Sequence, residues 1–194
     1  MPQLLNEAEL EEYLFGVLSE YGIISEEICG TPFRQVTFKG YGTADLIVLS
    51  TDLGLSAPKL IISIIELKKN EIDLTAVGQI CRYRKAILRL IEKNQRIHRH
   101  FEDIDIRGYL IGSVLGSGDV CYLIESIEWL TTIIYSISLE TGLELQTVLN
   151  GWHAPDEDFL DIEARFIGYV HKQIIPSYHS LLRKIKEEQE IRHK

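Results

Sequence analysis

Cysteine is scarce in this sequence and never closely paired. Its three cysteines, Cys29, Cys81 and Cys121, are odd in number and lie far apart along the 194 residues. A disulfide framework or a structural zinc site would need more cysteines or a closer spacing. We therefore expect reduced thiols and a cytoplasmic protein.

Long apolar runs and ordered histidine spacings are also missing. No apolar run approaches the roughly 18 residues of a membrane-spanning helix, and the N-terminal stretch is acidic, unlike a basic signal segment. The six histidines show no His-x-x-x-His or Glu-x-x-His spacing on a convincing helix face. We therefore expect neither a membrane partner nor a histidine-held metal or catalytic triad.

Positive charge is absent from the first part of the chain. Residues 1–30 contain seven acids and no Lys or Arg, whereas residues 82–99 contain seven bases and one acid. The formal net charge of -9 weighs against a nucleic-acid partner, because phosphate binding is mainly electrostatic. Because acidic and basic residues are separated along the chain, two alternatives stay open for the basic stretch: an ordinary solvated helix face or a DNA-binding face.

Two apolar runs, 42–50 and 60–69, predict neighbouring strands that carry charged side chains. Asp45 stands near the start of the first run, and Glu66 and Lys68 stand near the end of the second. Alternate residues of a strand share a face, so Glu66 and Lys68 should point one way and Leu67 the other. Burying a carboxylate costs several kcal/mol unless a partner or metal compensates it. We expect the three charged groups to converge on a cation site.

The order of these residues resembles the signature of the PD-(D/E)XK nuclease superfamily. Asp45 is followed, after about twenty residues, by Glu66-Leu67-Lys68, and Ala44 stands where the superfamily's name has proline. The run from Gln79 to Tyr83 is similar to the Gln-x-x-x-Tyr element of some branches. Those branches include the nuclease domains of type I restriction motor subunits and of recombination exonucleases. The resemblance covers about the first 125 residues.

The resemblance implies a restriction-endonuclease-like α/β core with a central mixed sheet. It also implies hydrolysis of DNA with Mg²⁺ or Mn²⁺, in restriction, defence or repair, with RNA as an alternative substrate. Its implied metal ligands are Asp45, Glu66, the Leu67 carbonyl and an acid of the first helix, Glu7 in preference to Glu11. Lys68 would orient the attacking water or neutralise the phosphate, and Gln79 would hold Lys68 or a phosphate oxygen.

Helix signals surround the predicted strands. Asn6 and Glu9 form a capping-box pattern for a helix that ends near Tyr21 and Gly22, in which Glu7 falls within the apolar stripe. A dipole-complementing acid is an equally good interpretation of Glu7.

A second helix should follow an Asp73 cap and end near residue 92, with Gln79 and Tyr83 sharing a face. Arg82, Lys85 and Arg89 should line one face of this helix, and with Tyr83 they are the candidate nucleic-acid contacts.

Further strands are predicted at 33–39, 107–115 and 119–126, and a hairpin at 132–148, giving a mixed α/β sandwich. We divide the chain into a nuclease core, 1–126, and a C-terminal hairpin with a helical extension, 127–194, that would pack on the core, bind a partner or form a homodimer. Two other functions stay open: a catalytically inactive nucleic-acid-binding module, and a structural α/β protein whose Glu66 and Lys68 form a surface pair.

Overall fold

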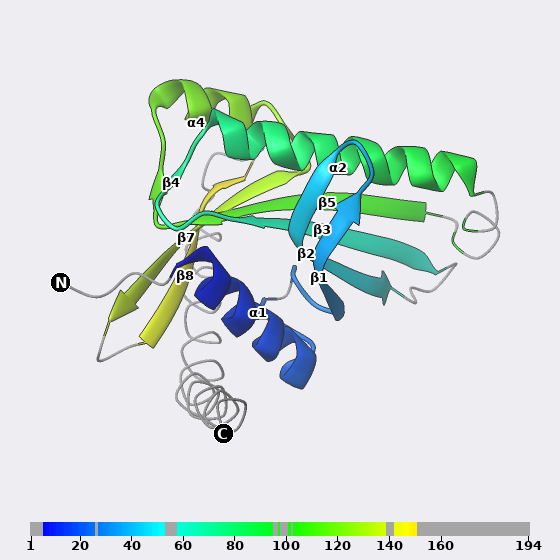
Figure 1. The fold of residues 1–194 in the computed structure, drawn as a ribbon, viewed down its shortest axis with the longest axis horizontal. Coiled ribbons are helices and arrows are strands. Elements are labelled where there is room, and N and C mark those ends of the chain that lie inside the picture. The colour runs from blue at the N-terminus through cyan, green and yellow to red at the C-terminus, as the bar shows by residue number, and fades with distance from the viewer. Residues whose placement is uncertain are drawn as a thin grey trace, which may run out of the picture.

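A six-stranded mixed sheet forms the middle layer of the structure, a computed structural model that describes residues 6–25, 27–52, 58–94, 97, 101, 103–138 and 142–150 (Figure 1). The strands lie in the order β1 (Thr31–Phe38), β2 (Gly42–Asp52), β3 (Lys59–Leu67), β5 (Asp103–Gly112), β7 (Leu130–Ser138) and β8 (Gly142–Asn150). Neighbours are antiparallel at both ends of the sheet and parallel from β3 through β5 to β7. The predicted α/β class with a central mixed sheet is confirmed.

The first helix, α1 (Glu7–Tyr21), covers one face of the sheet. Its predicted capping box is present: the Asn6 side chain accepts from the Glu9 N–H, and the Glu9 carboxylate accepts from the Asn6 N–H. Gly22 ends the helix at a φ of 72°, where a side chain would be strained. The apolar stripe of α1 is buried against Leu46, Ile65 and their neighbours on the sheet.

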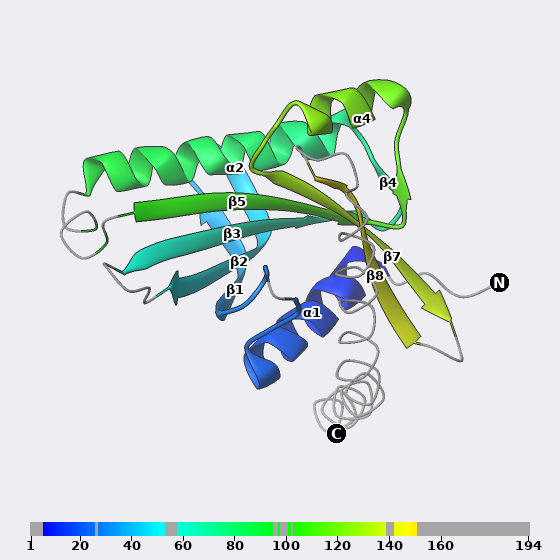
Figure 2. The same cartoon turned by 180° about the vertical axis from the view of Figure 1, so that it is seen from behind.

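The second helix, α2 (Leu74–Lys93), covers the opposite face, as both views of the ribbon show (Figures 1 and 2). Asp73 caps it as predicted, accepting from the Ala76 N–H at 2.8 Å. Ile80, Tyr83 and Ile87 pack from the helix onto this face of the sheet. The sheet is therefore enclosed between α1 and α2 over the ends of β2 and β3 that carry the charged residues.

The strand predicted at 119–126 is wrong, because these residues form helix α4 (Gly118–Glu125). Val120 and Ile124, four residues apart, are its buried side chains and pack in the same cluster as α2. Strands β5 and β7 are parallel, so the chain must cross over between them, and α4 lies in that crossover. Two short parallel strands, β4 (Glu71–Ile72) and β6 (Val114–Leu115), form a separate small sheet.

The predicted hairpin is present as β7 and β8, which pair antiparallel on either side of residues 139–141. It belongs to the same sheet as β3 and β5. The helical pattern predicted beyond residue 155 lies outside the described residues. Among the helices that the structure describes, none is long and apolar enough to cross a membrane.

Candidate functional site

The site forms where β2 and β3 separate. Their register runs from Asp52↔Lys59 to Leu46↔Ile65, so one further step would place Asp45 opposite Glu66. Main-chain pairing stops there, and Asp45 Oδ2 instead accepts a hydrogen bond from the Leu67 N–H at 2.8 Å. The carboxylate of Asp45 therefore takes the place of a strand carbonyl and brings its charge to the end of β3.

Glu66 is buried with half of its carboxylate unpaired. Glu66 is only 2% exposed, and its Oε1 accepts a hydrogen bond from Lys68 Nζ at 2.8 Å. Oε2 is buried and has no hydrogen-bond partner among the described residues. Leu67 packs in the α1 cluster on the other side, so the predicted alternation along β3 is confirmed. A buried oxygen without a partner is costly, and a ligand of positive charge would satisfy it.

The carboxylates perturb one another. Burial and then the charge of Asp45 raise the Glu66 pKa to about 7, although Lys68 acts to lower it. Burial also raises the pKa of Asp45, with Glu11 and Glu7 adding to the rise and the Leu67 N–H and Lys68 opposing it. One lysine does not offset the negative charge gathered here. The structure thus brings Asp45, Glu66 and Lys68 together, as the sequence predicts.

Two acids of α1 take different positions. Glu7 is exposed, not buried with the apolar stripe as its helical position suggests, and its Oε1 accepts from the Lys69 N–H at 3.1 Å. Its charge contributes to the raised pKa of Glu66. Glu7 therefore reaches the end of the strand that carries the site.

Glu11, which the sequence analysis ranked behind Glu7, is the buried acid of this helix. It is 5% exposed and accepts hydrogen bonds from Arg34 Nε, at 2.9 Å, and from the Gln35 side chain. Its position one turn after Glu7, beside Leu14 and Leu18 on the helix, was the signal available in the sequence. Glu11 joins α1 to β1, which leaves Glu7 nearer to the end of β3.

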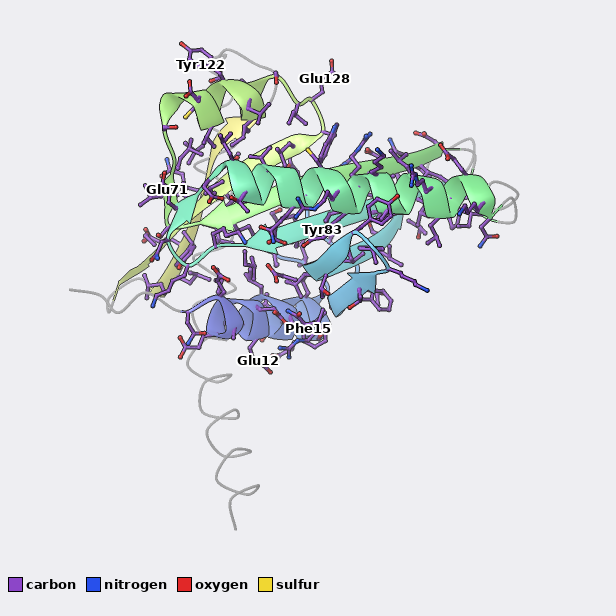
Figure 3. The ribbon with its side chains drawn as sticks, turned by 45° about the horizontal axis from the view of Figure 1, so that its top comes forward. Glu12, Phe15, Glu71, Tyr83, Tyr122 and Glu128 are labelled. Atoms are coloured by element: carbon purple, nitrogen blue, oxygen red, sulfur yellow. The ribbon has the colours of Figure 1, made fainter. Side chains whose placement is uncertain are left out.

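The Gln-x-x-x-Tyr pair of α2 lies against the same site. Tyr83 is 2% exposed and lies between α2 and the sheet (Figure 3). Burial raises its pKa, the charges of Glu66 and Asp45 raise it further, and a hydrogen bond from Gln79 opposes them. Gln79 thus forms a hydrogen bond with Tyr83, whereas the resemblance implies Lys68 or a phosphate oxygen as its partner.

The three basic residues proposed to contact nucleic acid, Arg82, Lys85 and Arg89, are exposed on α2, but they are not equivalent. The Arg89 guanidinium lies 5.7 Å from the centre of the Tyr41 ring and donates to the Tyr41 hydroxyl, so it joins α2 to the turn between β1 and β2. Arg82 and Lys85 form no ion pair within the part of the chain that the structure describes. Their charges are therefore available to a ligand.

Comparisons with protein-family models, with curated proteins and with solved structures find no match for this chain. The site has to be judged by its own chemistry. Within the described ranges, no group of three or more His, Cys, Asp or Glu side chains is arranged to hold a metal ion. Two carboxylates, Asp45 and Glu66, are still a sufficient protein share for Mg²⁺, which keeps several of its waters. The unpaired oxygen of Glu66 fits such an ion, and the Leu67 carbonyl stays a predicted ligand.

Proposed function

We propose that this protein is a metal-dependent nuclease that hydrolyses phosphodiester bonds in DNA and has a restriction-endonuclease-like core. One observation carries the proposal: the buried, half-unpaired carboxylate of Glu66 lies beside a second carboxylate, Asp45, and a lysine. A structural role for Glu66 would be served better by a fully paired or an apolar side chain. A cation and an anionic substrate supply what this arrangement lacks.

Asp45 and Glu66 would hold the ion, since carboxylate oxygens are the ligands that Mg²⁺ and Mn²⁺ prefer. When bound there, such an ion polarises a phosphodiester and lowers the pKa of a water molecule. Glu7, whose carboxylate binds the Lys69 N–H, would add negative charge beside these ligands. RNA is a substrate alternative that the same chemistry would serve.

Lys68 would act as a fixed positive charge on the reacting phosphate. Burial acts to lower its pKa, but the hydrogen bond to Glu66 and the nearby acids outweigh burial, and the pKa is raised. Lys68 is therefore protonated at neutral pH and stabilises charge that develops on phosphate oxygens, rather than removing a proton from water. Gln79, through its bond to Tyr83, would act on the packing of α2 against this site.

Substrate would approach along α2. This helix carries the exposed Arg82 and Lys85 as well as Tyr83. Each phosphate that they neutralise would release counterions from DNA. Arg89 would contribute less to binding, because its guanidinium is already stacked on Tyr41. The acidic remainder of the protein would then confine DNA to this face.

Cleavage of plasmid and linear DNA with Mg²⁺, Mn²⁺ or EDTA tests the proposal. Asp45→Asn, Glu66→Gln and Lys68→Ala should each abolish cutting, while Glu125→Gln, an exposed acid on α4, should leave it intact. Circular dichroism should show that all four variants are folded. Cutting that persists in EDTA, or in all three site variants, would contradict the proposal.

A catalytically inactive nucleic-acid-binding module is the second candidate. The lack of a three-residue metal group in the described residues favours it. It predicts DNA affinity that requires Arg82 and Lys85 but no cutting with either metal. The same cleavage assay, run beside a binding titration, separates the two functions.

A further inference from the structure

The strand that carries Glu66 and Lys68 loses its support just where those residues stand. On one side, pairing with β2 ends at Ile65. On the other side, pairing with β5 continues to Leu67, and the Lys68 N–H donates to the Ile111 carbonyl at 2.8 Å. Beyond Lys68 no strand pairing holds the described chain until β4 begins at Glu71. Some other contact must fix the position of the chain after Lys68.

The main chain of Lys69 supplies that contact, since both its N–H and its carbonyl are hydrogen-bonded. Its N–H donates to Glu7 Oε1 at 3.1 Å. Its carbonyl accepts from the Tyr135 hydroxyl at 2.9 Å and from Ser113 Oγ at 3.0 Å. The three partners come from α1, from β7 and from the junction of β5 and β6.

The same junction also holds the next residue. The Asn70 carbonyl accepts from the Ser113 N–H at 3.0 Å, and it shares the single proton of Ser113 Oγ, also 3.0 Å away, with the Lys69 carbonyl. Gly112 allows this close approach, because a Cβ at that position would lie 2.6 Å from Ile72 Cγ1. The chain after Lys68 is thus joined to the end of β5 at successive residues.

We propose that Ser113 and Tyr135 are positioning residues of the candidate site, acting through the Lys69 carbonyl. By holding this carbonyl they fix the direction in which β3 ends, and with it the place of the Lys68 ammonium group against Glu66. Their hydroxyl groups bond to main-chain carbonyls, so their effect is on geometry. The expected effect on turnover rests on the proposed nuclease function, whereas the effect on the main chain does not.

The chain offers a matched control for each hydroxyl. Tyr109, like Tyr135, is 1% exposed, and it donates to the Glu27 carbonyl at 3.3 Å. Ser126, like Ser113, donates to a backbone carbonyl, that of Leu123, at 2.7 Å. Tyr109→Phe and Ser126→Ala therefore remove the same chemical groups from other parts of the fold.

The experiment compares Tyr135→Phe and Ser113→Ala with these controls in two measurements on the full chain. Amide hydrogen exchange, without metal, should be faster at residues 68–70 in both site variants and unchanged there in both controls. In Mg²⁺-dependent cleavage, kcat should fall about 10- to 100-fold while the KM for DNA stays constant. Ser113→Thr, which keeps a hydroxyl group, should restore kcat.

Unchanged exchange at residues 68–70 would overturn the inference, and so would faster exchange with an unchanged kcat. A wild type that cuts no DNA would instead remove the nuclease proposal. Calorimetric Mn²⁺ titration then replaces kcat as the measure of site geometry. Weaker Mn²⁺ binding in Tyr135→Phe than in Tyr109→Phe would support the positioning role, and equal binding would overturn it.

Discussion

Replacing Glu66 with glutamine should stabilise the metal-free protein at neutral and alkaline pH. Its carboxyl pKa is raised from 4.5 to about 7, so the folded protein holds the proton more tightly than the unfolded chain does. A charged Glu66 therefore lowers the free energy of unfolding. This loss is absent below pH 4.5, grows as the pH rises to about 7, and is complete above that. Glutamine has the shape of the protonated acid and no charge to bury.

The size of the effect follows from the same values. One pKa unit corresponds to about 1.36 kcal/mol, so the rise to about 7 corresponds to about 3 kcal/mol in favour of Glu66→Gln at pH 8. The attraction of Lys68 for Glu66 is already included, because Lys68 acts on the same pKa. For a chain of this length, such a gain raises Tm by about 6–12 °C.

Thermal unfolding in EDTA between pH 4.5 and pH 8 would test this. The gap in Tm between Glu66→Gln and wild type should be largest at pH 8 and should close towards pH 4.5. Glu125→Gln, which removes an exposed carboxylate on α4, should follow the wild type throughout. A variant less stable than wild type at pH 8, or a gap that ignores pH, would refute the reasoning that Glu66 is buried beside excess negative charge.

Three further outcomes are expected. Mg²⁺ or Mn²⁺ at 100 times its dissociation constant should stabilise the wild type by about 2.7 kcal/mol at pH 8 and stabilise Glu66→Gln far less, as thermal shift would show. Replacing both Arg82 and Lys85 with Glu should weaken DNA binding and reduce the slope of log K against log salt by about 0.9 per lost duplex contact. The control variant Arg82→Lys with Lys85→Arg keeps both charges and should keep the slope. An unaltered slope in the Glu variant would contradict the DNA-binding role. Glu11→Ala should lower the free energy of unfolding by about 1–3 kcal/mol in urea, because the acid is buried and bonded to β1, and Glu12→Ala, which removes an exposed pair, by less than about 1 kcal/mol; equal losses would refute this difference.

Local patterns were enough to predict the elements around the site. Capping residues located the starts of α1 and α2, and strand alternation placed Glu66 and Lys68 on one face. Residues 119–126 were assigned to a strand because a short apolar run suits a strand and a helix equally well. The parallel pairing of β5 with β7, which requires a crossover there, is a long-range feature.

Side-chain contacts between distant parts of the chain could not be predicted. Glu11 is buried because Arg34 and Gln35 of β1 meet it, and no local pattern joins α1 to that strand. Tyr135 meets the Lys69 carbonyl across 66 residues of sequence. Both contacts depend on the order of strands in the finished sheet.

The bond between the Leu67 N–H and Asp45 has an evolutionary consequence. Leu67 is fully buried, so its N–H needs an acceptor whether or not the protein cuts DNA. An oxygen-bearing side chain at position 45 would therefore be kept both by selection for folding and by selection for catalysis. A descendant that lost its activity would be free to exchange Asp45 for Asn, which keeps the acceptor and discards the charge. If the proposed nuclease function holds, Asn at this position in a related chain would indicate that cutting has been lost while the fold is kept.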